Sequence, residues 1–89
     1  MREKFKNYLI NDAINKSGKK LKDSTIKDYL YRVERICREE NITLGVLAEN
    51  IDSYVEIYGP VGNKSKFGKG SHNSYISSLK HFQIFLSQY

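Results

Sequence analysis

Apolar residues between positions 23 and 38 recur at the spacing of one face of an α-helix. At roughly 100° per residue, the apolar side chains share one sector, which holds Ile26, Tyr29, Leu30, Val33, Ile36 and Cys37. The opposite sector holds Lys27, Tyr31, Arg35 and Arg38. The pattern predicts a helix that buries one face and presents three cations and a phenol on the other. Ser24 is the expected N-cap, because its hydroxyl can accept a hydrogen bond from a free N–H of the first turn.

The same period predicts helices over residues 2–16 and 44–58. The first should end at Gly18, which suits a left-handed C-terminal position. The second should begin at Thr43, with Asn50 as an alternative start. Residues 54–58 alone resemble a strand, but the longer helical period favours a helix.

A fourth helix is expected from the cap Ser71 to about residue 87. Its core face is predicted to contain Tyr75, Leu79, Phe82 and Leu86, flanked by Ile76 and Phe85. Its outer face is predicted to contain Asn73, Ser77, Lys80 and Ile84, with Ser74 and His81 at the edge. Between the third and fourth helices, residues 59–70 form a loop with four of the six glycines and the only proline. Four helices without a convincing strand predict an all-α, four-helix orthogonal bundle, with residues 1–89 as a single domain.

The charge distribution adds a candidate partner. The net charge is +5, and residues 1–27 carry eight Lys or Arg against three acids. Residues 28–58 carry three against seven, and residues 59–89 carry four lysines and no acid. Two basic ends around an acidic middle indicate a polyanionic partner on one side. The acidic outer face of the third helix, with Glu49, Asp52 and Glu56, should point away from it.

Catalytic and metal-binding motifs are not recognisable in the sequence. The glycine-rich loop departs from the phosphate-loop pattern, since Gly62 and Gly68 are one residue too far apart and Gly70 replaces the required Ser or Thr. His72 and His81 fall on opposite sides of one helix, so they cannot chelate one ion. The single cysteine, Cys37, is expected in the core, and it excludes an internal disulfide. No catalytic residue, metal or cofactor is therefore expected, and neither is a membrane partner.

Three motifs in order resemble the core-binding, SAM-like N-terminal domain of phage integrases and other tyrosine recombinases. They are Ser24-Thr-Ile-x-x-Tyr29-x-x-x-Val33, Asn50-Ile-Asp-x-Tyr-Val55, and Ser71-x-x-x-Tyr75-Ile-x-x-Leu79-Lys-x-Phe82-x-x-Phe85-Leu86. The resemblance implies a four-helix domain that grips duplex DNA through its second and fourth helices. It also implies a C-terminal catalytic domain of the same recombinase, absent from this chain, and sister recombinase subunits as partners on DNA. The loop 59–70 is longer than the family pattern leads one to expect.

The sequence thus predicts a non-catalytic, cytoplasmic DNA-binding domain. The expected DNA-binding residues come from two helix faces and two loops: Lys19, Lys20, Lys22, Lys27, Tyr31, Arg35, Lys64, Lys66, Lys69, Asn73, Ser77 and Lys80. One alternative is a small DNA-binding regulator of the helix-turn-helix type. The other is a helical protein-interaction module that uses the apolar patches at Ile10, Ile14 and Ile84.

Overall fold

The computed structural model describes residues 1–15, 17–59 and 72–88, and the side chains of residues 72–74 are outside this description. Within these ranges the chain is all-α, as predicted, and forms no β-strand beyond one isolated bridge. Its helices are α1 (Arg2–Asn11), α2 (Asp23–Glu40), α3 (Leu44–Glu49), α4 (Ile51–Ile57) and α5 (His72–Gln88). The predicted loop lysines Lys64, Lys66 and Lys69 and the predicted cap Ser71 lie outside the described residues.

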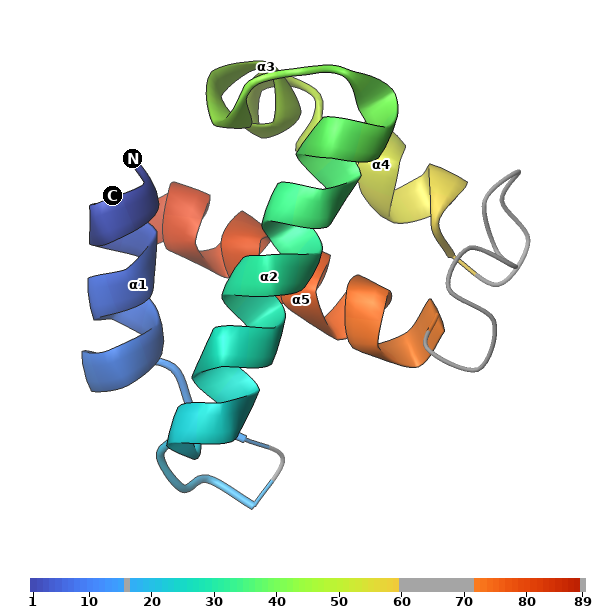
Figure 1. The fold of residues 1–89 in the computed structure, drawn as a ribbon. Helices are drawn as coiled ribbons and strands as arrows, with labels where there is room; N and C mark the ends of the chain where they lie inside the picture. The colour runs from blue at the N-terminus through green and yellow to red at the C-terminus, as the bar shows by residue number, and fades with distance from the viewer. Residues whose placement is uncertain (16, 60–71, 89) are drawn as a thin grey trace.

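Two long helices organise the fold. Figure 1 shows α2 crossing α5 near the centre of the molecule, with α1 at the left, α3 at the top and α4 at the right. The apolar face predicted for α2 is confirmed, since Ile26, Leu30, Val33, Ile36 and Cys37 are all buried, while Tyr29 is half-buried. Burying such a stripe against other helices supplies most of the stability of a helical domain.

The aromatic residues of α1 and α5 form the centre of the core. The Phe5 ring meets Phe82 edge-on, with centroids 5.0 Å apart, and lies 5.4 Å from Phe85. Tyr75, Leu79 and Phe82 are buried as predicted. Phe85 is buried too, whereas Leu86 packs against the core but is only half-buried, so the predicted order of burial of these two residues is reversed. The Phe85 side chain of α5 faces α1, where its ring contacts those of Phe5 and Tyr8.

The first helix ends at Asn11 and not at residue 16 as predicted. The backbone N–H groups of Asp12 and Ala13 both donate to the carbonyl of Tyr8, which closes the last turn. Beyond it, the Asn15 side chain accepts hydrogen bonds from the backbone N–H groups of Ser17 and Lys19, at 2.8 and 3.0 Å. An asparagine that bonds to its own backbone neighbours competes with a helix, which explains the early end.

The second helix begins at Asp23, with Lys22 and not Ser24 in the N-cap position. Lys22 has the extended backbone of an N-cap (φ −73°, ψ 154°) but makes no side-chain capping bond. The predicted cap Ser24 therefore lies inside the first turn. At the other end, Asn41 adopts the left-handed conformation (φ 56°). The N–H of Ile42 donates to the carbonyl of Cys37, which closes a Schellman-type end.

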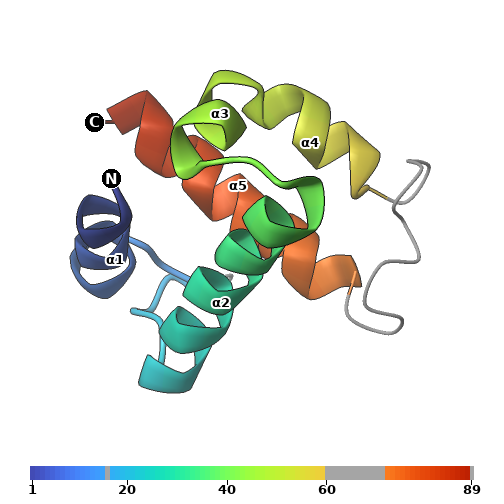
Figure 2. The ribbon, with the colours of Figure 1, turned by 45° about the horizontal axis from the view of Figure 1, so that its top comes forward.

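The expected helix over residues 44–58 is two helices, so the described part of the chain has five helices and not four. Both predicted starts are used. The Thr43 hydroxyl accepts the backbone N–H of Val46 at 3.2 Å and caps α3. Asn50 (φ −122°, ψ 26°) breaks the helix, and its side chain donates to the carbonyl of Val46 at 3.0 Å. Figure 2 shows the bend between α3 and α4, and the helical prediction for residues 54–57 is confirmed.

Candidate nucleic-acid interface

The segment between α1 and α2 is a short hairpin that carries three of the predicted DNA-binding lysines. An antiparallel bridge joins Ile14 to Lys20, and the backbone N–H of Asn15 donates to the carbonyl of Lys19 at 2.7 Å. Gly18 turns the chain with φ +78°, a conformation that side chains with a Cβ rarely adopt. Lys19, Lys20 and Lys22 are all exposed. Gly18 does have the predicted left-handed backbone, but in this hairpin and not at the end of a helix.

This hairpin forms one wall of a groove whose other walls are α2 and α5. We call it the hairpin groove, and its lining residues are Ile14, Asn15, Ser17, Tyr29, Ser77, Lys80, His81 and Ile84. No carboxylate is among them. Lys80 is exposed and Ser77 half-buried, so the groove offers an ammonium and a hydroxyl to a ligand.

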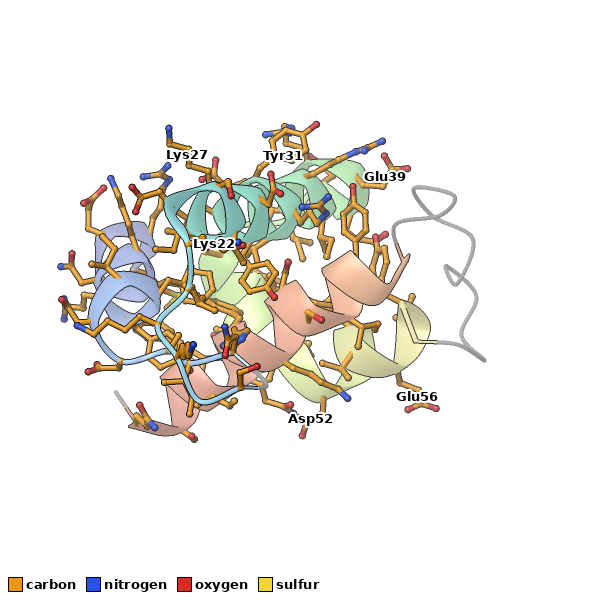
Figure 3. All side chains as sticks on the ribbon, turned by 90° about the horizontal axis from the view of Figure 1, so that it is seen from below. Lys22, Lys27, Tyr31, Glu39, Asp52 and Glu56 are labelled. Atoms are coloured by element: carbon orange, nitrogen blue, oxygen red, sulfur yellow. The ribbon has the colours of Figure 1, made fainter. Side chains whose placement is uncertain are left out.

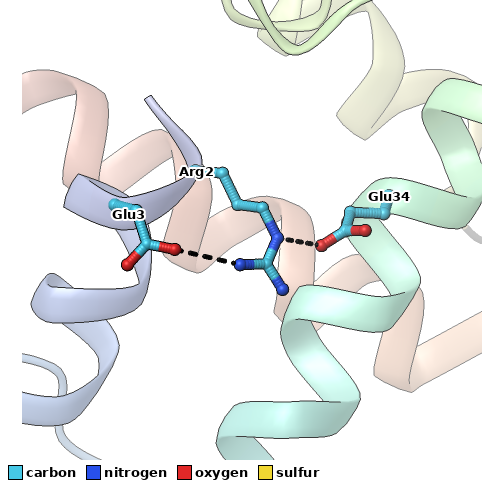
Figure 4. A network of polar contacts seen from close by, with 3 residues as sticks. All are labelled: Arg2, Glu3 and Glu34. Atoms are coloured by element: carbon cyan, nitrogen blue, oxygen red, sulfur yellow. Dashed lines mark hydrogen bonds and ion pairs between the residues drawn. The ribbon is translucent and has the colours of Figure 1, made fainter.

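Two other grooves formed by described residues contain acids. One lies between α1 and α5 and includes Asp12. The other lies between α1 and α2 and includes Asp23 and Glu34. There the Arg2 guanidinium donates to Glu34 Oε1 at 2.6 Å and to Glu3 Oε1 at 3.2 Å, as Figure 4 shows. Of these three grooves, the hairpin groove is therefore the one whose lining favours an anion.

The solvent face of α2 is as predicted for three of its four residues, since Lys27, Tyr31 and Arg38 are exposed. Lys27 is exposed, and Tyr31 keeps 53% of its surface accessible. The guanidinium of Arg38 lies 5.6 Å from the centroid of the Tyr31 ring, within the range of a cation–π contact. An exposed aromatic ring with a cation stacked on it is an arrangement suited to contacts with phosphate and sugar.

Arg35 is placed differently from its neighbours on that face. It is half-buried, and its Nη1 donates to the hydroxyl of Tyr75 at 2.9 Å, which ties α2 to α5. The Tyr75 ring stacks on Tyr58, and the Tyr58 hydroxyl donates to Glu40 Oε2 at 2.9 Å. Burial, followed by the bond to Glu40, raises the pKa of Tyr58 well above its usual value. Arg35 thus has a structural partner in the core, and its contact with DNA stays a prediction.

Figure 3 relates these side chains to the acidic residues. Lys27 and Tyr31 lie along one edge of the view, and Asp52 and Glu56 lie along the opposite edge. Lys22 lies between these edges. The acidic side chains of α4, Asp52 and Glu56, are exposed and point away from Lys27 and Tyr31, and their orientation relative to nucleic acid stays a prediction. Glu39, an acidic residue of α2, lies instead on the same side of the molecule as Tyr31.

His81 is a site residue that the sequence reasoning placed only at the edge of the outer face. Its ring is half-buried, and its Nδ1 lies 3.5 Å from the hydroxyl of Tyr8. The Tyr29 ring packs against it with centroids 5.2 Å apart. Burial lowers the pKa of His81 below its ordinary value. No periodicity signals this environment, because the tyrosines come from two other helices.

The structure therefore brings some of the predicted DNA-binding residues together on one surface and separates others. Ser77 and Lys80 line the hairpin groove. Lys27 and Tyr31 instead line the α1–α2 groove, together with Asp23 and Glu34. The three isoleucines are divided, since Ile14 and Ile84 line the hairpin groove and Ile10 lines the α1–α2 groove. Asn73 belongs to α5, but its side chain is outside the description.

Comparison with known proteins gives no assignment: no protein-family model, no curated protein and no solved structure matches the chain. Within the described ranges, none of the helices combines the length and the apolar character needed to cross a membrane.

Proposed function

We propose that this chain is a DNA-binding domain of the core-binding, SAM-like type found in tyrosine recombinases and integrases. The order of its helix motifs supports the family, and the hairpin groove supports the binding surface. The observation that carries the proposal is the bridge between Ile14 and Lys20. It closes the lysine-bearing hairpin, and three other hairpin residues line a groove with Ser77 and Lys80 of α5. The lining of that groove contains no carboxylate.

The expected division of labour follows from the rigidity of each element. Lys19, Lys20 and Lys22 are exposed cations on a short hairpin, which suits phosphate contacts that do not depend on sequence. Ser77 and Lys80 lie on a helix anchored by buried side chains, and such rigid positioning is what the reading of base edges requires. Partners on this proposal are duplex DNA, the catalytic domain of the same recombinase, and sister subunits. The compartment is the cytoplasm, and the chain by itself neither cleaves nor religates DNA.

The experiment is a titration of fluorescent duplex DNA at about 50 and 200 mM salt. Because cations that neutralise phosphates release counterions, binding should weaken steeply with salt. Lys20→Gln should weaken binding to all sequences and lower the salt slope by about one unit. Lys4→Gln is the matched control, since Lys4 is an exposed lysine of the α1–α5 groove, where Asp12 also lies. Equal effects of the two variants would refute the assignment of the hairpin face.

A protein-interaction module is the second candidate, and the exposure of two isoleucines favours it. Ile14 and Ile84 keep 56% and 44% of their surface accessible and line the same groove. An apolar interface would depend weakly on salt, whereas a DNA interface depends on it strongly. Absence of duplex binding even at low salt, in a folded sample, would favour the interaction module.

A further inference from the structure

The hairpin groove contains a titratable side chain that the proposed function does not use. His81 lines the groove together with Lys80 and Ser77. Its ring is half-buried between two tyrosines, with the Tyr8 hydroxyl 3.5 Å from Nδ1 and the Tyr29 ring 5.2 Å away between centroids. The neutral imidazole has one donor and one acceptor nitrogen, whereas both nitrogens of the protonated ring donate.

The groups around His81 come from each element packed against it. Tyr8 is the titratable group from α1, and burial, followed by the charge of Asp12, raises its pKa, so it keeps its proton. Asp12 itself lines the α1–α5 groove and not the hairpin groove. From α2 comes Tyr29, and from α5 comes the cation Lys80.

The hairpin side of the groove contributes Ile14, Asn15 and Ser17, none of which titrates in the physiological range. The lysines of the same hairpin add positive charge nearby. His81 therefore faces a cation and neutral groups across this groove. In the free protein, burial opposes the protonation of His81.

We propose that His81, in its protonated form, is a further ligand of a phosphate group held in the hairpin groove beside Ser77 and Lys80. The inference rests on the proposed function, because the phosphate is taken to belong to the DNA backbone. A bound phosphate supplies the negative charge that the groove lining lacks. It therefore favours the imidazolium by charge and by a hydrogen bond, and offsets the effect of burial.

Proton uptake and phosphate binding are then linked. If phosphate raises the pKa of His81, lowering the pH must tighten phosphate binding by the same free energy. Uptake of one proton limits the effect to about tenfold in affinity per pH unit. Binding of DNA should accordingly strengthen between pH 7.5 and 5.5, and His81→Gln, which keeps a neutral polar side chain, should remove that part of the dependence.

The test follows the imidazole resonances of His81 by NMR through a pH titration of the folded protein. The titration is run alone, with inorganic pyrophosphate, and with a short duplex at low salt. A His72→Gln background leaves His81 as the only histidine, because the chain has two. The expected result is a higher pKa of His81 with either ligand. This measurement needs no change at His81, so it stands even if His81→Gln fails to fold.

The outcomes separate the inference from the function on which it rests. The role of His81 is overturned if the duplex binds and the pKa of His81 stays unchanged. It is also overturned if the folded His81→Gln variant shows the same pH dependence of duplex binding. Both outcomes leave DNA binding itself intact. If pyrophosphate raises the pKa of His81 but the duplex does not bind, His81 remains a ligand of an anion and the DNA assignment is overturned. Binding of neither ligand overturns both.

Discussion

The bond between Arg35 and Tyr75 gives a direct way to separate a structural cation from a DNA-contacting one. Arg35 Nη1 donates to the Tyr75 hydroxyl at 2.9 Å, and Tyr75 is only 2% exposed. Hydrogen bonds that involve a charged group contribute about 1.5–3 kcal/mol. Because Arg35 is half-buried and water competes for its guanidinium, we expect the lower end, about 1.5 kcal/mol.

Two variants and their combination isolate this energy. Tyr75→Phe removes the hydroxyl but keeps the ring, so the stacking on Tyr58 and the contact with the Arg32 guanidinium, 5.7 Å from the ring centroid, remain. Arg35→Met removes the donor and keeps an aliphatic stem. Since both residues have other neighbours, the single variants overstate the pair, and the double-mutant cycle gives the coupling energy.

Urea denaturation followed by circular dichroism at the helical band measures that coupling. For 89 residues the total stability is expected at about 4–13 kcal/mol, so each single variant should stay folded at low urea. At a slope of about 1 kcal/mol per molar urea, Tyr75→Phe should lower the midpoint by roughly 1.5 M. A coupling energy below about 0.3 kcal/mol would show that the two side chains act independently. A loss of DNA affinity in Arg35→Met that Tyr75→Phe does not share, in folded samples, would instead mark Arg35 as a DNA contact.

Three further predictions test helix capping, acid stability and thiol reactivity. Thr43→Ala should lower the free energy of unfolding by about 1 kcal/mol in urea denaturation, because the Thr43 hydroxyl caps α3. Ser24→Ala should change the same free energy by less than about 0.5 kcal/mol. Equal losses in the two variants would contradict the capping assignment. Burial keeps the folded pKa of His81 below its unfolded value, so the unfolded chain binds the proton first as the pH falls. The stability of the protein should therefore decrease as the pH drops from about 6.5 toward the lowered pKa of His81. His81→Gln should remove this part of the loss. Burial raises the pKa of the Cys37 thiol, so it should react slowly with a disulfide reagent in the native state and rapidly in urea, and prompt native reaction would contradict its burial.

Local chemistry was enough to predict much of the fold. The helical period of α2 identified its buried face, because a continuous apolar stripe on a helix is buried whichever element packs against it. Thr43 was recognisable as a cap because a hydroxyl before an apolar helical pattern satisfies a local backbone donor. The burial of Cys37 followed from its position in the same stripe. Each of these features depends on neighbours within one or two helical turns.

Other features depended on competition between local options that the pattern alone does not rank. Asn15 bonds to the hairpin backbone, and the first helix ends early at Asn11, although the apolar spacing continued to Ile14. Asn50 was available both as an interior residue and as a helix start, and the chain uses it as a break. Small polar side chains offer the backbone alternative hydrogen bonds, so their effect depends on whether the following segment packs better in a new direction.

The sequence by itself thus determined most of the residues that form the core, since these follow from side-chain chemistry and helical period. Only the tertiary structure decided which exposed groups meet. The bridge from Ile14 to Lys20 and the packing of α2 on α5 bring Ser77, Lys80 and His81 to the same groove as the hairpin. The same packing places Arg35 on Tyr75, forty residues away in sequence. Contacts at such separations depend on how whole helices cross, and the period of a single helix carries no information about that crossing.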